Sequence, residues 1–199
     1  MSQEEIENEP KINSSDRTTW VDKHALASIA IHSNVPGFPE PVCFVSDGDE
    51  KRLVEQMLDH LKAMSATASR YLREKLQYVY EQLDTLSAAE GEAKNAASLK
   101  LKLDEFVDEL VVLGFNSSRY DMAIVRKDVF AQLFKQESIS YVIKKSSAQY
   151  ACVKTPSLKF VDVCSYLAAG SSYAEFLKAY GAPIEKAHFL TRILIVSRN

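Results

Sequence analysis

Residues 110–130 read LVVLGFNSSRYDMAIVRKDVF, and the periodicity of the chain changes twice within them. They begin as a short apolar run rich in β-branched side chains, which is typical of a buried strand. A polar turn, GFNSSRY, follows, and the apolar residues of the next stretch recur at helical spacing. The sequence therefore predicts a strand, a turn and a helix beginning near Ser118. This arrangement places Asp121 in the first helical turn, beside the carboxyl end of the strand.

Two strands and a long helical region are predicted before this stretch. Residues 27–32 and 42–45 have strand character and are separated by a proline- and glycine-rich connection. Helical spacing of apolar residues runs over 51–86, as one long helix or two shorter ones, and a second helix is predicted over about 99–110. The alanine-rich, charged segment around Gly91 separates them, which indicates an αα-hairpin insertion.

Three more strands and a helix are predicted after the stretch. The runs ISYVIKK, QYACVKT and LKFVDVC have strand character, and SSYAEFLKAYG has a serine cap and a glycine stop that are typical of a helix. The order is strand, strand, helices, strand, helix, three strands, helix. Such an order predicts an α/β domain with a mixed sheet.

Composition and length favour one intracellular, soluble domain. The chain has 199 residues, of which 46% are apolar, and a net charge of −3, so any surface that binds nucleic acid must be local. Its three cysteines lack metal-site spacing and suit a reducing compartment. No apolar run indicates a signal peptide or a membrane span. Residues 1–23 are polar and are predicted to be a disordered leader.

The carboxylate of Asp121 has two interpretations. Ligands of open α/β sheets usually bind at the carboxyl ends of the strands, and Mg²⁺ takes oxygen ligands from one or two carboxylates together with substrate phosphates. Aspartate in a first helical turn is also common for capping and dipole reasons alone. The residue types permit a metal site here and do not require one.

Asn116, followed after three residues by Tyr120 and Asp121, resembles the second exonuclease motif of family B DNA polymerases, N-x2-3-[FY]-D. The segments HSNVPGFPEPVCFV, VVLGFNSSRYDMAIVRKDVF and LKFVDVCSYLAAGSSYAEFLKAYG occur in the order found in the organellar, viral and transposon-encoded type B enzymes, which resemble the protein-primed polymerases. The resemblance covers roughly residues 25–181.

The resemblance implies a fold, a ligand and roles for individual residues. The fold would be a partial RNase H-like 3′–5′ exonuclease domain over 24–181, with the helical insertion at about 51–110 and an unmatched tail at 182–199. Asp121 would be the catalytic ligand of Mg²⁺ or Mn²⁺. The 3′ end of single-stranded DNA would contact Asn116, Tyr120 and Leu167.

The chain departs from the family pattern at several points. No D-x-E strand precedes the matching region, and the acidic cluster at Asp47 and Asp49 is better explained as the cap of the following helix. The third motif, Y-x3-D, and the palm signatures are absent. Val163 and Cys164 occupy the positions of a Ser-Leu pair that contacts DNA in the family, although Leu167 keeps an apolar position. A decayed or fragmentary polymerase gene, inactive alone, is therefore expected.

The competing hypothesis is a noncatalytic interaction protein. In that case the long helices over 51–110 would be the working surface, and the turn at Asn116 would be purely structural. An exposed apolar stripe on those helices would favour this second function. The tail FLTRILIVSRN has no polar stop and is predicted to be strand-like and exposed.

Overall fold

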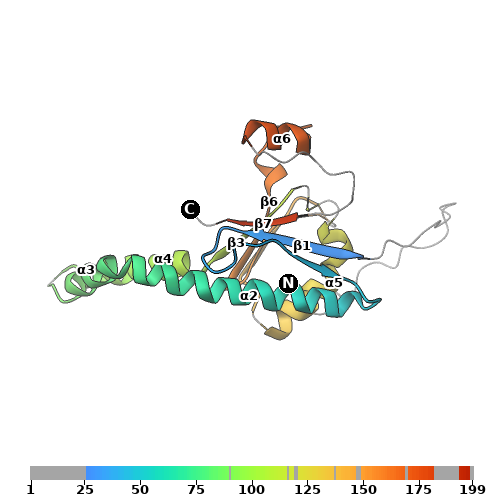
Figure 1. The fold of residues 1–199 in the computed structure, drawn as a ribbon. Helices are drawn as coiled ribbons and strands as arrows, with labels where there is room; N and C mark the ends of the chain where they lie inside the picture. The colour runs from blue at the N-terminus through green and yellow to red at the C-terminus, as the bar shows by residue number, and fades with distance from the viewer. Residues whose placement is uncertain are drawn as a thin grey trace.

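The computed structural model describes residues 26–197 apart from 90, 116, 119–120, 137, 147–148, 169 and 182–192. The described part of the chain is a mixed α/β fold around a seven-stranded sheet of order β2-β1-β7-β3-β6-β5-β4 (Figure 1). The strands are β1 (Ser28–Ser33), β2 (Val42–Val45), β3 (Leu110–Gly114), β4 (Tyr141–Lys144), β5 (Tyr150–Lys154), β6 (Leu158–Asp162) and β7 (Ile193–Ser197).

The helices follow the order that the sequence predicts. They are α2 (Glu50–Lys75), α3 (Gln77–Ser87), α4 (Ala93–Asp108), α5 (Asp121–Gln136), the 3-10 helix η1 (Val163–Ser165) and α6 (Tyr173–Ala179). The predicted serine cap of the last helix is confirmed, because Ser172 and Glu175 form a reciprocal capping box. None of the helices in the described residues combines the length and apolar character needed to cross a membrane.

The sheet is mixed because two of its neighbouring pairs are parallel. β1 pairs with β7 and β3 pairs with β6 in parallel, whereas the remaining neighbours are antiparallel. The strands β4, β5 and β6 form an antiparallel meander, and its last strand, β6, runs parallel to β3. Both strands of this parallel pair end at the same edge of the sheet.

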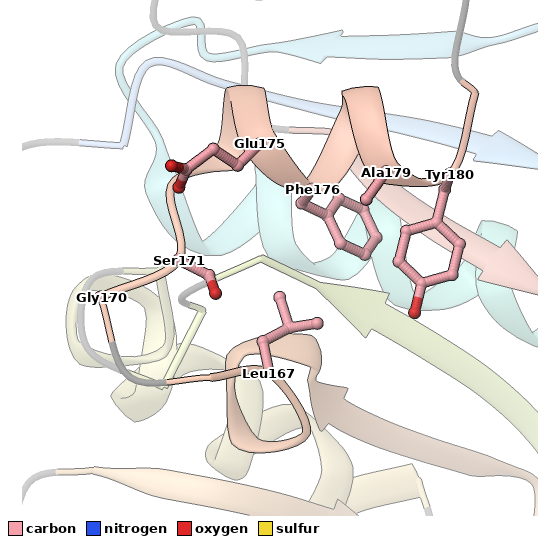
Figure 2. A pocket seen from close by; sticks show the side chains of 7 residues that line it. All are labelled: Leu167, Gly170, Ser171, Glu175, Phe176, Ala179 and Tyr180. Atoms are coloured by element: carbon pink, nitrogen blue, oxygen red, sulfur yellow. The ribbon is translucent and has the colours of Figure 1, made fainter.

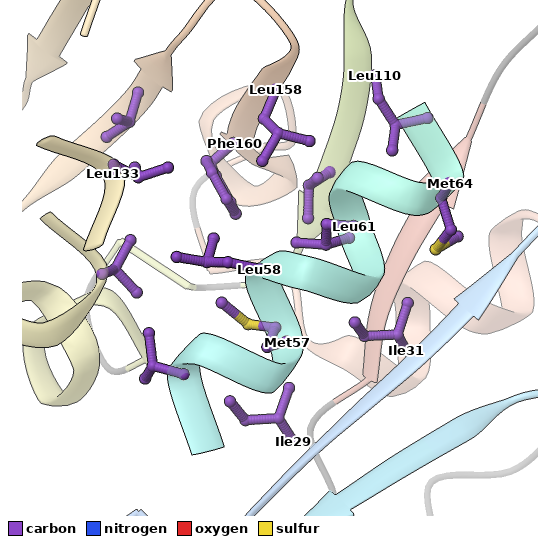
Figure 3. Packing of buried hydrophobic residues seen from close by; sticks show 14 of the residues in the cluster. Ile29, Ile31, Met57, Leu58, Leu61, Met64, Leu110, Leu133, Leu158 and Phe160 are labelled. Atoms are coloured by element: carbon purple, nitrogen blue, oxygen red, sulfur yellow. The ribbon is translucent and has the colours of Figure 1, made fainter. Parts of the chain in front are cut away.

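Helix α2 covers one face of the sheet and forms most of the core with it. Its buried side chains recur every three or four residues, so they share one face of the helix. Figure 3 shows Met57, Leu58, Leu61 and Met64 directed at apolar residues of the strands, with Leu133 of α5 beside them. Helix α5 packs next to α2 on the same side, and a hydrogen bond of 2.6 Å joins Gln132 to Glu55.

Beyond the sheet, α2 continues and packs against α3 and α4. The part of α2 after Ser65 together with α3 and α4 is called the helical arm here (Figure 1). Arg73 of α2 binds Asp104 and Asp108 of α4 at 2.9 and 2.8 Å. Burial and the hydrogen bond donated to Asp104 raise the pKa of Tyr80 to about 12. These polar contacts join the three helices into one unit.

The start of α4 and the place of the C-terminal tail differ from the sequence-based prediction. Helix α4 begins at Ala93, six residues before the predicted start near Leu99. The intervening residues, AKNAAS, lack apolar periodicity, but alanine has the highest helix propensity, so the helix extends through them. The tail was predicted to be an exposed strand. As β7 it is instead paired on both sides, with β1 and β3, so its backbone is not exposed at a sheet edge.

A charged cluster joins the end of α4 to the β5-β6 hairpin. The carboxylate of Glu109 accepts from Lys154 at 2.7 Å and from Lys159 at 3.1 Å, and its side chain is only 16% exposed. Burial alone would raise the pKa of Glu109, but the hydrogen bonds from the two lysines outweigh burial and lower the pKa below its usual value of 4.5. This cluster therefore connects the end of α4 to the β5-β6 hairpin, although the two segments are distant in sequence.

Acidification is expected to weaken the ion pairs between Glu109 and the two lysines. Because the pKa of Glu109 is lower in the folded chain, its stabilising contribution is present above pH 4.5 and is lost as the pH falls through the folded pKa. The contribution is about 1 kcal/mol, since the ion pair is only partly shielded from water. Urea unfolding below and above pH 4.5 should show this loss in the wild type and a smaller loss in Glu109→Gln. Equal acid sensitivity in the two proteins would contradict the assignment.

Candidate functional site

The candidate site lies where the parallel strands β3 and β6 end. Gly114 of β3 is paired with Asp162 of β6, so the chain leaves both strands at the same level of the sheet. After β3 it passes through Phe115 and the turn to α5, and after β6 it enters η1. Two loops that are more than 40 residues apart in sequence therefore meet at one edge, which is the position where α/β sheets commonly bind ligands.

Asp162 connects the two loops. The amide of Ser118 donates to Asp162 Oδ2 at 3.3 Å, and the Ser118 hydroxyl donates to the same oxygen. The amide of Cys164 donates to Asp162 Oδ1 at 3.1 Å, which makes Asp162 the N-cap of η1. The Asp162 side chain is buried, at 2% exposure, and both of its oxygens have partners. This carboxylate therefore hydrogen-bonds to the turn that follows it, and its main structural effect is to fix the turn before α5.

Asp121, the predicted metal ligand, is the first residue of α5. The helix begins three residues later than the predicted start near Ser118, but Asp121 remains in its first turn. Its backbone therefore lies just beyond the β3 end, where the helix dipole favours a carboxylate. The side chain of Asp121 lies outside the described part of the structure, and so do Asn116 and Tyr120, the predicted contacts to a DNA strand.

Phe115 links the β3 end to α6. Its ring packs against Tyr173 and Phe176, with centroid distances of 5.0 and 5.6 Å. The Phe176 ring in turn packs against Tyr180 at 4.9 Å. Residues 173, 176 and 180 are spaced by three and four positions, so they share one side of the helix. Figure 1 shows α6 beyond the end of β6, with α2 and α5 on the opposite side of the sheet.

Leu167, the predicted apolar contact to DNA, lies shortly after η1 and faces α6. Together with α6 residues it lines an open hollow (Figure 2). Val163 and Cys164, which occupy the positions of the hydroxyl-bearing pair of the family, form the 3-10 turn itself. Cys164 contributes its backbone amide to Asp162 there. Asp162, Leu167 and the start of α5 are therefore gathered around the ends of the two parallel strands.

The acidic cluster after β2 belongs to the start of α2. Asp49 is the N-cap, and its side chain accepts from the amides of Lys51 and Arg52 at 3.0 and 3.1 Å. Asp47 pairs with the Arg52 guanidinium at 3.0 Å. The capping interpretation is therefore confirmed for Asp49, whereas Asp47 binds the Arg52 guanidinium and the Asp49 amide instead.

Sequence reasoning missed two components of the site. One is Ser118, whose amide and hydroxyl both bind Asp162, although nothing local in the sequence distinguishes it from Ser117. The other is the aromatic side of α6, for which the spacing YAEFLKAY was an available signal. Within the described residues, no three His, Cys, Asp or Glu side chains are grouped so that they could hold a metal ion.

Comparisons with protein-family models, with curated proteins and with solved structures returned no match to this chain. The class of the protein is therefore inferred from the strand ends, the turn before α5 and the motif residues.

Proposed function

We propose that the chain corresponds to part of the 3′–5′ exonuclease domain of a type B DNA polymerase of the organellar, viral or transposon-encoded group. Its fold would be RNase H-like, and its ligand would be the 3′ end of single-stranded DNA. The proposal is supported chiefly by one observation: β3 and β6 are parallel neighbours that end together at Gly114 and Asp162, and α5 then begins at Asp121. A motif aspartate thus follows a strand end at the edge where such sheets bind ligands.

The roles proposed for individual residues follow from the motif. Asp121 would hold Mg²⁺ or Mn²⁺, whose charge supplies attraction for a phosphate oxygen of the strand. Asn116 and Tyr120 would contact the terminal nucleotide, and Leu167 would provide an apolar contact. Two-metal hydrolysis needs several converging carboxylates. Both oxygens of Asp162 are already engaged with Ser118 and Cys164. We therefore propose that this chain binds single-stranded DNA with the help of a metal ion, and that it does not hydrolyse the DNA efficiently alone.

Oligonucleotide binding with and without metal tests this function. A short fluorescent oligothymidylate is titrated with the protein, and anisotropy is measured with Mn²⁺ or with a chelator. The wild type is expected to bind more tightly with Mn²⁺, because the cation offsets repulsion between Asp121 and the phosphates. Asp121→Ala is expected to remove this metal dependence and to weaken binding in Mn²⁺ about tenfold, or about 1.4 kcal/mol.

Asp128→Ala is the matched control, because Asp128 lies on the same helix two turns further on. It removes the same charge from α5 and should leave the metal dependence intact. If Mn²⁺ changes nothing in the wild type, or if both aspartate variants behave alike, the polymerase-derived function is wrong.

A second function, an interaction protein that uses the helical arm, is favoured by exposed apolar side chains on α3 and α4. The most exposed of these side chains are Tyr78, Leu101 and Phe106, at 69%, 69% and 59% exposure. Apolar surface of this kind is typical of sites that bind other proteins. This function needs no contribution from Asp121, so it predicts that Asp121→Ala leaves all binding properties unchanged. The titration above therefore separates the two functions.

A further inference from the structure

A hollow of about 420 Å³ lies between α6 and the loop after η1 (Figure 2). It is lined by Leu167, Gly170, Ser171, Glu175, Phe176, Ala179 and Tyr180. Its volume lies in the range of about 300–1,000 Å³ that small-molecule sites occupy. We call it the α6 hollow.

The walls of the α6 hollow are suited to a flat ring. Figure 2 shows the side chains of Phe176 and Tyr180 projecting from α6 toward Leu167, which forms the opposite wall. The Tyr180 ring packs in a tilted arrangement against Phe176, with ring centroids 4.9 Å apart, and Tyr180 is nevertheless 72% exposed. An exposed aromatic ring supported from behind by a second ring is a rigid surface for stacking, because little side-chain entropy remains to be lost.

The polar groups at the rim favour a base over a phosphate. The Glu175 carboxylate accepts from the Ser172 amide at 2.8 Å, and this contact lowers the pKa of Glu175. The rim therefore carries a negative charge at neutral pH, which repels phosphate but can accept a hydrogen bond from an N–H group, and every DNA base has such a group. The Ser171 hydroxyl, which donates to the Ala168 carbonyl at 2.8 Å, still has acceptor capacity.

The α6 hollow is also joined to the candidate site. Phe115, the residue after β3, packs on Tyr173 and Phe176. A continuous series of rings thus runs from the β3 end to Tyr180. Under the proposed function, a DNA strand whose terminal nucleotide lies at the start of α5 would extend along these rings toward the hollow.

We propose that the α6 hollow binds a nucleobase of single-stranded DNA, stacked on Tyr180 and enclosed by Leu167. This inference rests on the proposed function, because the DNA strand must first bind where β3 and β6 end. It adds a second contact point, in which Tyr180 recognises the face of a base without regard to its identity. Stacking contacts of this type tolerate any base sequence.

A tryptophan placed at position 180 reports on the hollow directly. Trp20 is the only tryptophan in the sequence, so Trp20→Phe combined with Tyr180→Trp leaves one indole, in the hollow. Its fluorescence is expected to be quenched by a short oligonucleotide and not by an abasic oligonucleotide of equal charge. Tyr78→Trp in the same background is the control, since Tyr78 is similarly exposed but lies on α3, away from α6 (Figure 1).

Affinity measurements complete the test. Tyr180→Ala is expected to weaken oligonucleotide binding about five- to tenfold, and Tyr180→Phe to leave it nearly unchanged, because stacking requires the ring rather than the hydroxyl. Binding of the oligonucleotide without quenching at position 180, or an unchanged affinity of Tyr180→Ala, overturns this inference and leaves the proposed function standing. Absence of any anisotropy change with the wild type overturns both.

Discussion

Asp162→Ala is expected to destabilise the chain by about 3 kcal/mol. Asp162 is 2% exposed and accepts from the Ser118 amide, the Ser118 hydroxyl and the Cys164 amide. Removing the carboxylate leaves these donors without their partner, and each buried unsatisfied donor costs about 1–3 kcal/mol. The loss is expected to be smaller than the simple sum, because the hydroxyl can rotate and water can enter the space. Urea unfolding measures the free energy of unfolding.

Asp162→Asn is the informative control for this variant. It has nearly the same size and keeps a carbonyl oxygen for the Cys164 amide, but its NH₂ group faces the donors of Ser118. We therefore expect a loss of about 1–2 kcal/mol, between wild type and Asp162→Ala. Because Ser118 precedes the start of α5, both variants should also weaken oligonucleotide binding. A fully stable Asp162→Ala protein would show that the carboxylate does not fix the turn.

Leu58→Ala is expected to cost about 3 kcal/mol, within the usual range of about 2–5 kcal/mol for truncating a buried leucine. Leu58 is completely buried at the centre of the contact between α2 and the sheet (Figure 3). The truncation removes apolar contacts and leaves a cavity that the surrounding residues cannot fill. For a chain of this size the melting temperature should fall by about 6–12 °C.

Leu99→Ala is the matched control for the core variant. It makes the same chemical change on α4, where the side chain is 51% exposed. Its effect on the free energy of unfolding should be within about 0.5 kcal/mol. Equal melting temperatures for the two variants would contradict the packing of α2 against the sheet.

The boundaries predicted best from sequence are those with strong local signals. The strand Val42–Val45 is bounded by proline on one side and by polar capping residues on the other, and the structure reproduces it. Helix α6 has a serine cap and a glycine stop, and Gly181 has a positive φ of 65° that suits a helix end. In both segments local propensity and tertiary packing agree, so the local signal was sufficient.

The errors arose where a local signal was missing or tertiary contacts decided. The start of α4 was placed late, because alanines give no apolar periodicity even though they favour a helix. The tail was predicted to be an exposed strand, but β7 lies between β1 and β3. Strand order depends on contacts between residues far apart in sequence. The local pattern that identified β7 as a strand could not identify its neighbours.

The candidate site was partly predictable for the same reason. The position of Asp121 in a first helical turn follows from the change of periodicity around it, and α5 begins there. The hydrogen bonds between Ser118 and Asp162 join residues that are 44 positions apart in sequence, so they depend on the parallel pairing of β3 with β6. The roles of Asn116, Tyr120 and Asp121 in binding DNA and metal stay predictions that rest on the motif.

Paramagnetic line broadening by Mn²⁺ tests the central claim most directly. In spectra of the backbone amides, substoichiometric Mn²⁺ is expected to broaden signals near the strand ends first, those of Gly114, Phe115 and Ser118 among them, because relaxation falls steeply with distance from the ion. The same signals should stay sharp in Asp121→Ala. Broadening confined to Asp47 and Asp49 at the start of α2, or the same broadening in Asp121→Ala, would contradict a cation site at the ends of β3 and β6.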